Sequence, residues 1–515
     1  AELAAQVTPV LNEVGVRQVI NGPIPYSADG DFVLGWAPGF QNLMMATGFL
    51  YGIAAGGGAG EMIAEWIVQG APSLNLWPLD VRRFGPHHGS RAFMYPRAVE
   101  HYAHHYKMRY PGAEHPTMRQ LRLSPLYERL KGNGAVYGTR NGWERPLWFA
   151  PEGVPPVDQL DFLAPGWHAF AAEEHRAVRE GVALIDQSSF AKFRLEGRDA
   201  MAVLNRVCAN DVDVAPGKLV YTQWLNEKGG IEADLTVTRL SETAYLIVTG
   251  AETEVKDFNW LKRHTPEDAH AVLTNISSGM GVISIMGPNS RALLQSISPN
   301  DLSHEAFPFA TSQEIELGYA IVRASRITYV GELGWELYIP TEFMAGVYDA
   351  IVAAGAAFGL KHCGYHALNA LRMEKAYRHW GHDITDEDTP LEAGLGFAVK
   401  MDKVGGFIGR EAVAAQKEGG LKQRLVQFLL KSPEPMLYHN EPIWQGDRIA
   451  GYIRSGMYAH TLGGACGLGY VDAADGGVVG PIGADDYEIE IAGVRYPVIA
   501  SLKPFYDPTN ARIKI

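Results

Sequence analysis

Residues 221–237 read Tyr221-Thr222-Gln223-Trp224-Leu225-Asn226-Glu227-Lys228-Gly229-Gly230-Ile231-Glu232-Ala233-Asp234-Leu235-Thr236-Val237. Apolar residues on both sides of a glycine-containing turn predict two strands joined by that turn. Asp234 lies in the second run, which is otherwise suited to a buried strand. Because an unpaired buried carboxylate is costly, Asp234 needs a partner or a ligand.

Two later segments also place acids and aromatic residues beside glycine turns. Residues 326–338 hold Tyr329, Glu332 and Glu336 around small residues, an arrangement that suits a flat heterocycle. Residues 371–396 resemble a helix end followed by a long ordered loop. For each of these acids, an ordinary capping or salt-bridge role is the alternative interpretation.

Near the start of the chain, a run of glycines from Gly56 to Gly60 precedes apolar residues at helical spacing. We interpret this run as a glycine loop that feeds a helix N-terminus, where backbone amides could approach a phosphate or a flavin ring. Close packing of a strand against a helix is the alternative. The nearly uncharged stretch 42–60 is expected to be a buried turn and helix rather than a membrane span, because of its glycine content and the charges that follow.

Changes in sequence texture divide the chain into several domains of an α+β protein. The prolines between 151 and 156 form a stiff joint, after which strands and helices alternate. Helical periodicity ends near residue 423, and two short strands flank Ala492-Gly493 in the pattern of a tight hairpin. A small C-terminal β-barrel is therefore expected.

Composition excludes several classes of function. The 515 residues include 45 basic and 58 acidic side chains, for a net charge of −13, so neither nucleic acid nor an anionic membrane is an expected partner. The three cysteines are far apart, which predicts neither a disulfide framework nor a zinc site. His101 and His105 could share a helical face, but the glutamate of an H-E-x-x-H site is missing, so no metal is expected.

The three acidic segments, in this order, resemble the aminomethyltransferase folate-binding family typified by the glycine-cleavage T-protein. The patterns G-G-x-x-x-D, ending at Asp234, and Y-x-G-E-x-G-x-E, from Tyr329 to Glu336, carry this resemblance. Upstream stretches resemble the dimethylglycine and sarcosine dehydrogenase family; they are Asn21-Gly22-Pro23, Asp29-Gly30, Gly48-Phe49, Leu76 to Phe84, Ser124 to Tyr127 and Gly142 to Pro146.

The resemblance covers essentially the whole chain and implies a multidomain α+β fold. It implies four parts: a C-terminal remnant of an FAD-dependent oxidoreductase domain, a connecting region, an aminomethyltransferase folate-binding domain and a C-terminal β-barrel, at residues 1–80, 81–160, 161–420 and 421–515.

Members of that family oxidise an N-methyl group of a small amino acid with FAD, and the resulting iminium carbon reaches tetrahydrofolate to give methylenetetrahydrofolate. This chain has no G-x-G-x-x-G opening and no equivalent of the flavin-attachment histidine. FAD is therefore expected only if the missing flavin-binding segment is supplied, for instance by a partner chain. In that case Gly48, Gly52 and Gly57 would approach the flavin ring. A cytoplasmic location, or the mitochondrial matrix in a eukaryote, is expected.

Carried over position by position, the resemblance assigns roles to four residues. Asp234 is expected near folate N10 as a base or orienting acceptor. Tyr329 is expected to pack on or bond to the folate, Glu336 to accept hydrogen bonds from the pterin N–H groups, and Tyr221 to line the pocket. The sequence predicts a pterin-sized pocket with Asp234 and Glu336 at opposite ends. An arginine of the T-protein branch has no equivalent here, because its position is occupied by Leu368.

Two alternatives to the folate half of an oxidative demethylase stay open. The first is a stand-alone tetrahydrofolate-dependent aminomethyl or methyl transferase without flavin activity. The second is a non-catalytic folate-binding protein, against which the joint presence of Asp234, Tyr329 and Glu336 counts.

Overall fold

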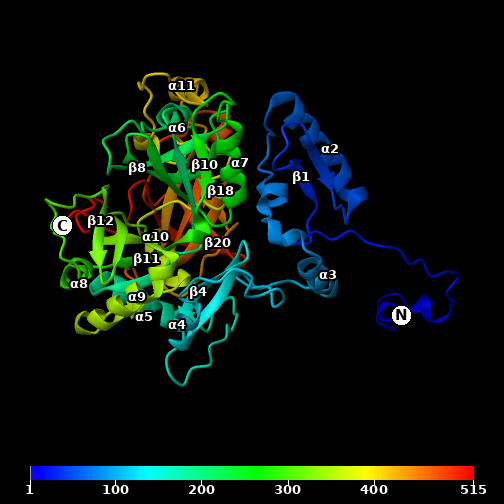
Figure 1. The fold of residues 1–515 in the computed structure, drawn as a ribbon. Helices are drawn as coiled ribbons and strands as arrows, with labels where there is room; N and C mark the ends of the chain where they lie inside the picture. Colours follow the sequence, from blue (N-terminus) through cyan, green and yellow to red (C-terminus); the bar gives the residue numbers. More distant parts are fainter. Residues whose placement is uncertain (1) are drawn as a thin grey trace.

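The computed structural model describes residues 2–515, which form an N-terminal unit, a two-sheet middle domain and a C-terminal barrel (Figure 1). In the N-terminal unit, blue in Figure 1, an antiparallel strand pair packs on one long helix through a small cluster around Trp66. The elements of this unit are α1 (Glu2–Val7), β1 (Val33–Trp36), β2 (Met44–Thr47), α2 (Gly52–Gln69) and α3 (Arg91–His104).

The glycine run lies inside helix α2, so the predicted glycine loop is wrong. The helix begins at Gly52 and continues through the run, because the apolar spacing that follows extends back over it. The expectation of a buried helix is wrong as well, since only Ala59 and Trp66 of α2 are buried. A Cβ atom built on Gly56 or Gly57 would meet nothing within 4 Å. No close packing among the described residues therefore requires these glycines.

The first sheet of the middle domain is antiparallel, with strand order β10-β6-β9-β8-β7. Its outer face packs on two helices through a core that includes Phe193, Leu204 and Leu261. Its elements are β6 (Ala191–Glu196), α6 (Ala200–Val207), β7 (Leu219–Leu225), β8 (Ile231–Ser241), β9 (Ala244–Thr249), α7 (Glu254–Arg263) and β10 (Val272–Asn275).

The second sheet has strand order β12-β13-β14-β11-β5-β15 and is antiparallel except for the β5–β15 pair. Its outer face packs on helices through Ile283, Trp335 and Ile351. Its elements are α5 (His168–Glu180), β5 (Ala183–Asp186), β11 (Met280–Met286), α8 (Ser290–Ile297), β12 (Ser312–Leu317), β13 (Ala320–Ser325), β14 (Gly334–Pro340), α9 (Met344–Gly355), β15 (Lys361–His362) and α10 (Tyr365–Glu374).

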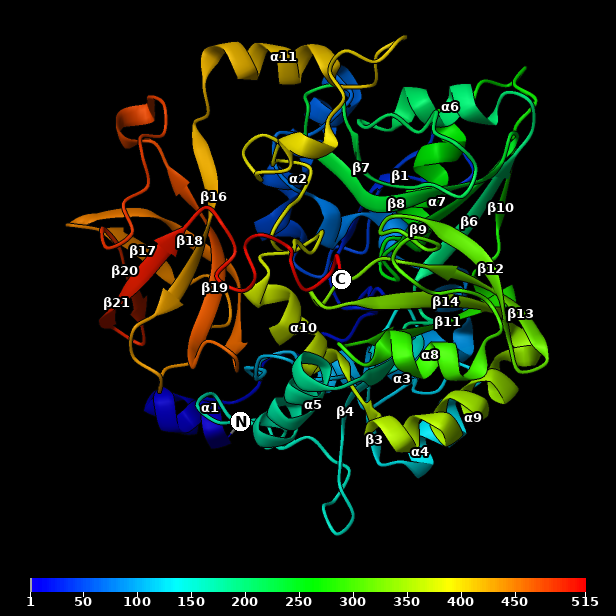
Figure 2. The same ribbon diagram turned by 90° about the vertical axis from the view of Figure 1, so that its left-hand side faces the viewer.

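The inner faces of the two sheets are turned toward each other (Figure 2). Leu246 of β9 packs there against Val282 of β11 and Tyr338 of β14. Because side chains alternate along a strand, every second residue of β8 and β14 points into the space between the sheets. That alternation determines which side chains can reach a ligand held there.

A hairpin closes the middle domain on the side of the N-terminal unit. Leu130 and Trp148 join the cores of the middle domain, and the hairpin turn at Gly142 lies against His87 of the preceding segment. The predicted domain limits at residues 80, 160 and 420 stay predictions. The elements are α4 (Tyr127–Gly132), β3 (Ala135–Arg140) and β4 (Trp143–Phe149).

The C-terminal strands form a closed barrel in the order β16-β19-β18-β17-β20-β21, which confirms the expected small barrel and the multidomain α+β class. The predicted hairpin is present, with positive φ at Ala492 and Gly493. The elements, preceded by α11 (Arg410–Gly419), are β16 (Gln423–Leu430), β17 (Pro442–Gln445), β18 (Arg448–Ala459), β19 (Gly464–Asp472), β20 (Glu488–Ile491) and β21 (Val494–Ser501).

After β21 the chain returns to the middle domain. The Lys375 Nζ donates to the backbone oxygen of Asp507 at 2.7 Å, and Arg326, which is fully buried, donates to that of Ile515 at 2.6 Å. The segment after the barrel is thus attached to the middle domain at two points. Among residues 2–515, none of the helices combines the length and the apolar character needed to cross a bilayer.

Candidate functional site

Asp234 projects from β8 into the space between the sheets, because its neighbours Ala233 and Leu235 fill the helix-covered face. Gln223 lies opposite on β7, and its Nε2 donates to Asp234 Oδ1 at 2.7 Å. Burial raises the pKa of the Asp234 carboxyl to about 6, although the Gln223 hydrogen bond opposes the shift. Asp234 can therefore exchange a proton near neutral pH.

Tyr221 and Arg378 complete the surroundings of this carboxyl. Tyr221 is on the same face of β7, where burial and then the charge of Asp234 raise its pKa, and its ring lies 6.1 Å from that of Phe397, at 27°. Arg378 donates to the backbone oxygens of Ala376 and Ala393, and its charge lowers the pKa of Asp234. The sequence did not single out Arg378, since its loop carries no periodic signal.

Tyr329 is in the loop between β13 and β14, where its hydroxyl donates to the backbone oxygen of Arg378 at 2.8 Å. Its ring lies nearly parallel to that of Tyr377, with centroids 6.0 Å apart. Burial raises its pKa, so the hydroxyl stays protonated. Tyr329 is thus brought close to Asp234 and Tyr221 around Arg378.

Glu336 projects from β14 toward the first sheet, because Trp335 and Leu337 fill the outer core. The Tyr338 hydroxyl donates to Glu336 Oε2 at 2.7 Å, and burial raises the pKa of this carboxyl. Glu336 and Asp234 therefore lie on opposed faces of the two sheets. A carboxylate on one side and a proton-exchanging carboxyl on the other suit a ligand with N–H donors at one end and a reacting amine at the other.

The predicted pterin pocket stays a prediction. Two cavities of about 310 Å³ each lie elsewhere: one beside α11, between Glu227 and Arg410, and one in the N-terminal unit. The second is lined by Tyr51, His101, Arg109 and neighbouring polar residues. Among residues 2–515 there is no group of three or more His, Cys, Asp or Glu side chains arranged to bind a metal ion.

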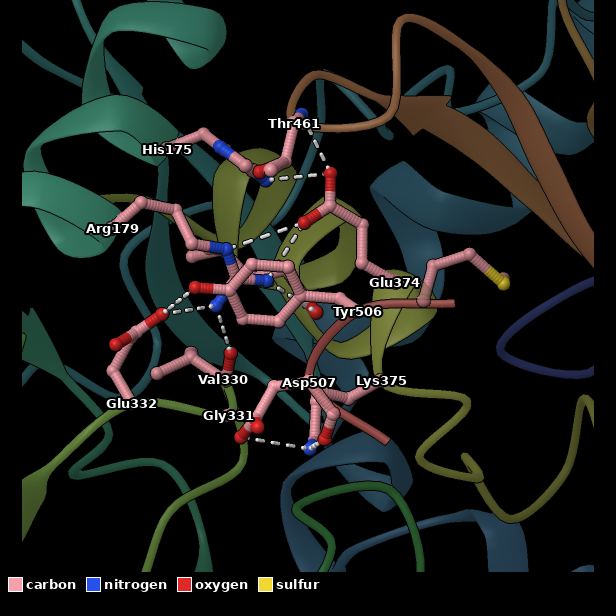
Figure 3. Close-up of polar contacts among 12 residues, drawn as sticks. His175, Arg179, Val330, Gly331, Glu332, Glu374, Lys375, Thr461, Tyr506 and Asp507 are labelled. Carbon is pink, nitrogen blue, oxygen red and sulfur yellow. Dashed lines mark hydrogen bonds and ion pairs between the residues drawn. The ribbon is translucent and has the colours of Figure 1, made fainter. Parts of the chain in front are cut away.

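Glu332, the first glutamate of the Y-x-G-E-x-G-x-E pattern, points away from this space into a buried cluster (Figure 3). Its carboxylate accepts from Arg179 of α5 at 3.1 Å, from the Tyr506 hydroxyl at 2.5 Å and from Arg512 at 3.0 Å. Arg179 also donates to the backbone oxygen of Val330 at 2.6 Å. The cluster therefore fixes the loop that carries Tyr329.

Glu374 of α10 is the second acid of the cluster, and it is fully buried (Figure 3). It accepts hydrogen bonds from Arg179 at 2.8 Å and from the Thr461 amide at 2.7 Å, and His175 Nε2 lies 3.2 Å from Glu374 Oε1. Burial alone would raise the pKa of Glu374, but His175 and Arg179 lower it to about 2. We call Arg179, Glu332, Glu374 and Tyr506 the Arg179 cluster. The Arg179 cluster joins the loop that carries Tyr329, helix α10 and the barrel segment.

The three predicted flavin-side glycines lie apart from Asp234, in the N-terminal unit. Gly48 has a φ of +73°, which favours glycine. Gly52 starts α2, whose N-terminus has no side-chain cap, and Gly57 faces open space. An uncapped helix N-terminus fits the electron-rich edge of a flavin ring. The contact of these three residues with FAD stays a prediction.

Three family descriptions match consecutive parts of the chain. The GCVT N-terminal domain matches residues 126–403 and the glycine cleavage T-protein C-terminal barrel domain matches residues 423–507. The chain belongs to the glycine cleavage T-protein family. The FAD dependent oxidoreductase central domain matches residues 69–124, so a T-protein unit follows flavoenzyme sequence here.

Relatives confirm the resemblance to the dimethylglycine and sarcosine dehydrogenase family. The chain is 38% identical over 99% of its length to a 4-methylaminobutanoate oxidase (formaldehyde-forming) of Paenarthrobacter nicotinovorans and 36% identical over its whole length to human mitochondrial sarcosine dehydrogenase. It spans 61% and 60% of those relatives. An aminomethyltransferase of Bacillus mycoides (strain KBAB4) is 32% identical over 76% of this chain and 98% of the relative.

Proposed function

We propose that this chain is the folate-dependent half of an oxidative N-demethylase. It transfers a carbon from the iminium of a small N-methylated amino acid to tetrahydrofolate, which gives 5,10-methylenetetrahydrofolate. The observation that carries the proposal is the half-buried Asp234 carboxyl, with a pKa of about 6, on the face opposite Glu336. Membership of the T-protein family supports it.

The transfer needs one site that first accepts and then returns a proton. As the two folate N–H groups bond to the iminium carbon, two protons are released, and the carbon–nitrogen bond to the leaving amine breaks. The amine leaves protonated, so it takes up both protons and the charge balances. In this proposal Asp234 accepts a proton from the attacking folate nitrogen and passes it to the departing amine.

The other residues bind and orient the folate. Glu336 accepts hydrogen bonds from the pterin N–H groups, since a paired donor edge suits a carboxylate. Tyr329 and Tyr221 supply ring faces beside Asp234. The Arg179 cluster keeps the Tyr329 loop in place through Glu332 and the Val330 carbonyl.

FAD, when bound, would supply the two-electron oxidation of the N-methyl group. Gly48, Gly52 and the N-terminus of α2 would hold the ring end of that cofactor. Apolar side chains on α2, such as Ile53 and Val68, are exposed, and we propose that the flavin-binding part, within the same protein or in a partner chain, covers them. Three buried free cysteines fit a reducing compartment, the cytoplasm or the mitochondrial matrix.

Calorimetric titration of the purified chain with tetrahydrofolate tests the binding half of the proposal. Exchange of a ¹³C-labelled methylene group between 5,10-methylenetetrahydrofolate and sarcosine, followed by NMR, tests the transfer half. Saturable binding with exchange that depends on Asp234 is expected. Absence of folate binding would refute the proposed function.

A stand-alone aminomethyltransferase is the second candidate. The two T-protein matches, which cover the middle domain and the barrel, favour it. Co-expression with the N-terminal flavin-binding part of sarcosine dehydrogenase separates the two candidates. Retention of a yellow flavin with this chain supports the demethylase, whereas folate transfer with no association supports the stand-alone enzyme.

A further inference from the structure

The arginines around the β3–β4 hairpin differ in whether they form an ion pair with a glutamate. Three of them pair with a glutamate at 2.5 to 2.7 Å; the pairs are Arg119–Glu144, Arg122–Glu254 and Arg140–Glu252. Arg145 of β4 has no carboxylate within ion-pair distance among the described residues. One guanidinium of this group therefore makes no direct ion pair in the described chain.

Arg145 is nevertheless held in a defined position. Its guanidinium lies over the ring of Tyr365 at 4.2 Å from the centroid, and the Tyr365 hydroxyl is 3.3 Å from Ser189 Oγ. The Arg145 side chain is half-buried, and its Nε is buried with no hydrogen-bond partner in the described chain. Since an arginine stays charged in proteins, keeping it here costs stability. Such a cost is typical of a group that binds something else.

Arg145 lies at the seam between the N-terminal unit and the T-protein unit. Trp77 of the N-terminal unit packs edge-on against Trp380, with ring centroids 5.4 Å apart. His379 and His382, beside that contact, have ring centroids 4.6 Å apart. Burial opposes ionisation of Glu252, but Arg140, His379 and Arg145 lower its pKa to about 2. Burial lowers the pKa of both His379 and His382, so these imidazoles are neutral, and the positive groups around Glu252 are the two arginines, of which Arg140 already engages it.

The seam is also continuous with the predicted folate site. His379 directly follows Arg378, whose carbonyl accepts the Tyr329 hydroxyl. Tyr365, beneath Arg145, belongs to the same packed cluster as Tyr329. A ligand that reaches Asp234 from the side of the N-terminal unit would therefore pass or end beside Arg145.

We propose that Arg145 binds a carboxylate of a ligand used by the folate site. The inference rests on the proposed function and adds a recognition residue to it. Two ligands carry such a group: the glutamyl end of tetrahydrofolate and the N-methylated amino acid. A guanidinium fixed on an aromatic ring offers the planar pair of donors that a carboxylate accepts.

The test measures Kd values for probes that differ in the carboxylate. Tetrahydrofolate is compared with tetrahydropteroamide, which ends in an uncharged amide in place of the glutamyl group, and dimethylglycine with dimethylethylamine, which lacks the carboxylate. The variants are Arg145→Met, which keeps the length and removes the charge, and Arg145→Lys, which keeps a charge. Arg129→Met is the matched control, because Arg129 is exposed and pairs with Asp349.

We expect Arg145→Met to weaken one carboxylate-bearing probe by about 10- to 100-fold, with little change for its carboxylate-free analogue. Arg145→Lys should fall between, and Arg129→Met should match the wild type. The thermal midpoint of Arg145→Met should be equal to or above that of the wild type, since a partly buried charge without a direct ion pair is removed. A purely structural arginine would lower it.

The outcomes separate the two ligand sources and the two proposals. Selective loss for tetrahydrofolate assigns the glutamyl group, and selective loss for dimethylglycine assigns the amino acid. Equal losses for a probe and its analogue, or none, overturn the role of Arg145 even if tetrahydropteroamide binds and the proposed function stands. If neither folate binds but dimethylglycine binding depends on Arg145, the proposed function fails alone. If no probe binds the wild type, both fail.

Discussion

The Arg179 cluster and helix α2 differ in how far their side chains find contacts within the described chain. In the cluster, one buried arginine meets two glutamates, two backbone carbonyls and the Tyr506 ring at 3.8 Å. On α2, glycines face open space and Ile53 is fully exposed. The charged groups of the first region are paired within the described chain, whereas the second region exposes apolar side chains and glycines that make no contact there.

This difference shows which region makes its contacts within the described chain and which region exposes surface that could bind a partner. Buried charges are costly unless they are paired, and the pairs of the Arg179 cluster join the middle domain to the segment after the barrel. Exposed apolar surface on a helix indicates a contact that the helix was selected to make. The chain spans about 60% of the length of the oxidase and dehydrogenase relatives it matches.

The largest expected effect comes from breaking the complete region. Glu374→Ala leaves Arg179 with half of its compensation, so the free energy of unfolding should fall by about 3 to 5 kcal/mol. Chemical denaturation measures the loss. The matched control is Asp349→Ala, whose exposed pair with Arg129 should contribute no more than about 1 kcal/mol. Equal effects of the two variants would mean that the cluster is not a stabilising junction.

The next effect concerns Asp234, a carboxyl outside the Arg179 cluster whose hydrogen-bond partner is the neutral Gln223. Asp234→Asn keeps the shape and the Gln223 contact but removes the proton acceptor, so methylene exchange should slow by about 100-fold or more. Folate affinity, measured by calorimetry, should change little. A variant that exchanges at the wild-type rate would remove Asp234 from the catalytic role.

The pH dependence of methylene exchange tests the same role of Asp234. With a folded pKa of about 6, about a tenth of Asp234 is ionised at pH 5, so exchange should be about tenfold slower there than on its plateau above pH 7. The folded pKa is above the unfolded one, so this carboxyl favours folding most below pH 4 and loses that contribution as pH rises through 6. Asp234→Asn should therefore gain stability over the wild type between pH 4 and 8. Parallel pH curves for both proteins would contradict the assignment.

The smallest effect tests the open region. Because a methyl group at Gly57 meets nothing within 4 Å, Gly57→Ala should stabilise α2 by about 1 kcal/mol through helix propensity alone. Circular dichroism during thermal unfolding measures the change. If the surface serves a flavin or a partner, the same variant should impair flavin retention in the co-expression experiment. Destabilisation of the chain alone would show that Gly57 is packed after all.

The positions of Asp234 and Glu336 could be predicted because local patterns determine them. Alternation along β8 and β14, with apolar neighbours on one side, sets the direction of both carboxyls. The Ala492-Gly493 turn is equally local. The prediction of a glycine loop is wrong because two effects compete at the glycine run. Intrinsic propensity opposes a helix at each glycine, but the apolar spacing after the run extends the helix backward over it.

Long-range contacts explain what the sequence could not reveal. Glu332 belongs to a pattern that suggests ligand binding, yet its partners Tyr506 and Arg512 come 174 and 180 residues later. That no carboxylate within residues 2–515 pairs with Arg145 likewise depends on which glutamates reach the other arginines of the hairpin. Neither fact has a local signal in the sequence.

The return of the chain after β21 has a consequence for how the protein is made. Glu332 is made before Tyr506 and Arg512, which come 174 and 180 residues later, so its burial waits for these partners. Until they are made, water can reach the contact between the middle domain and the segment after the barrel. Once that contact has closed, the middle domain and the barrel should open and exchange amide hydrogens together as one cooperative unit.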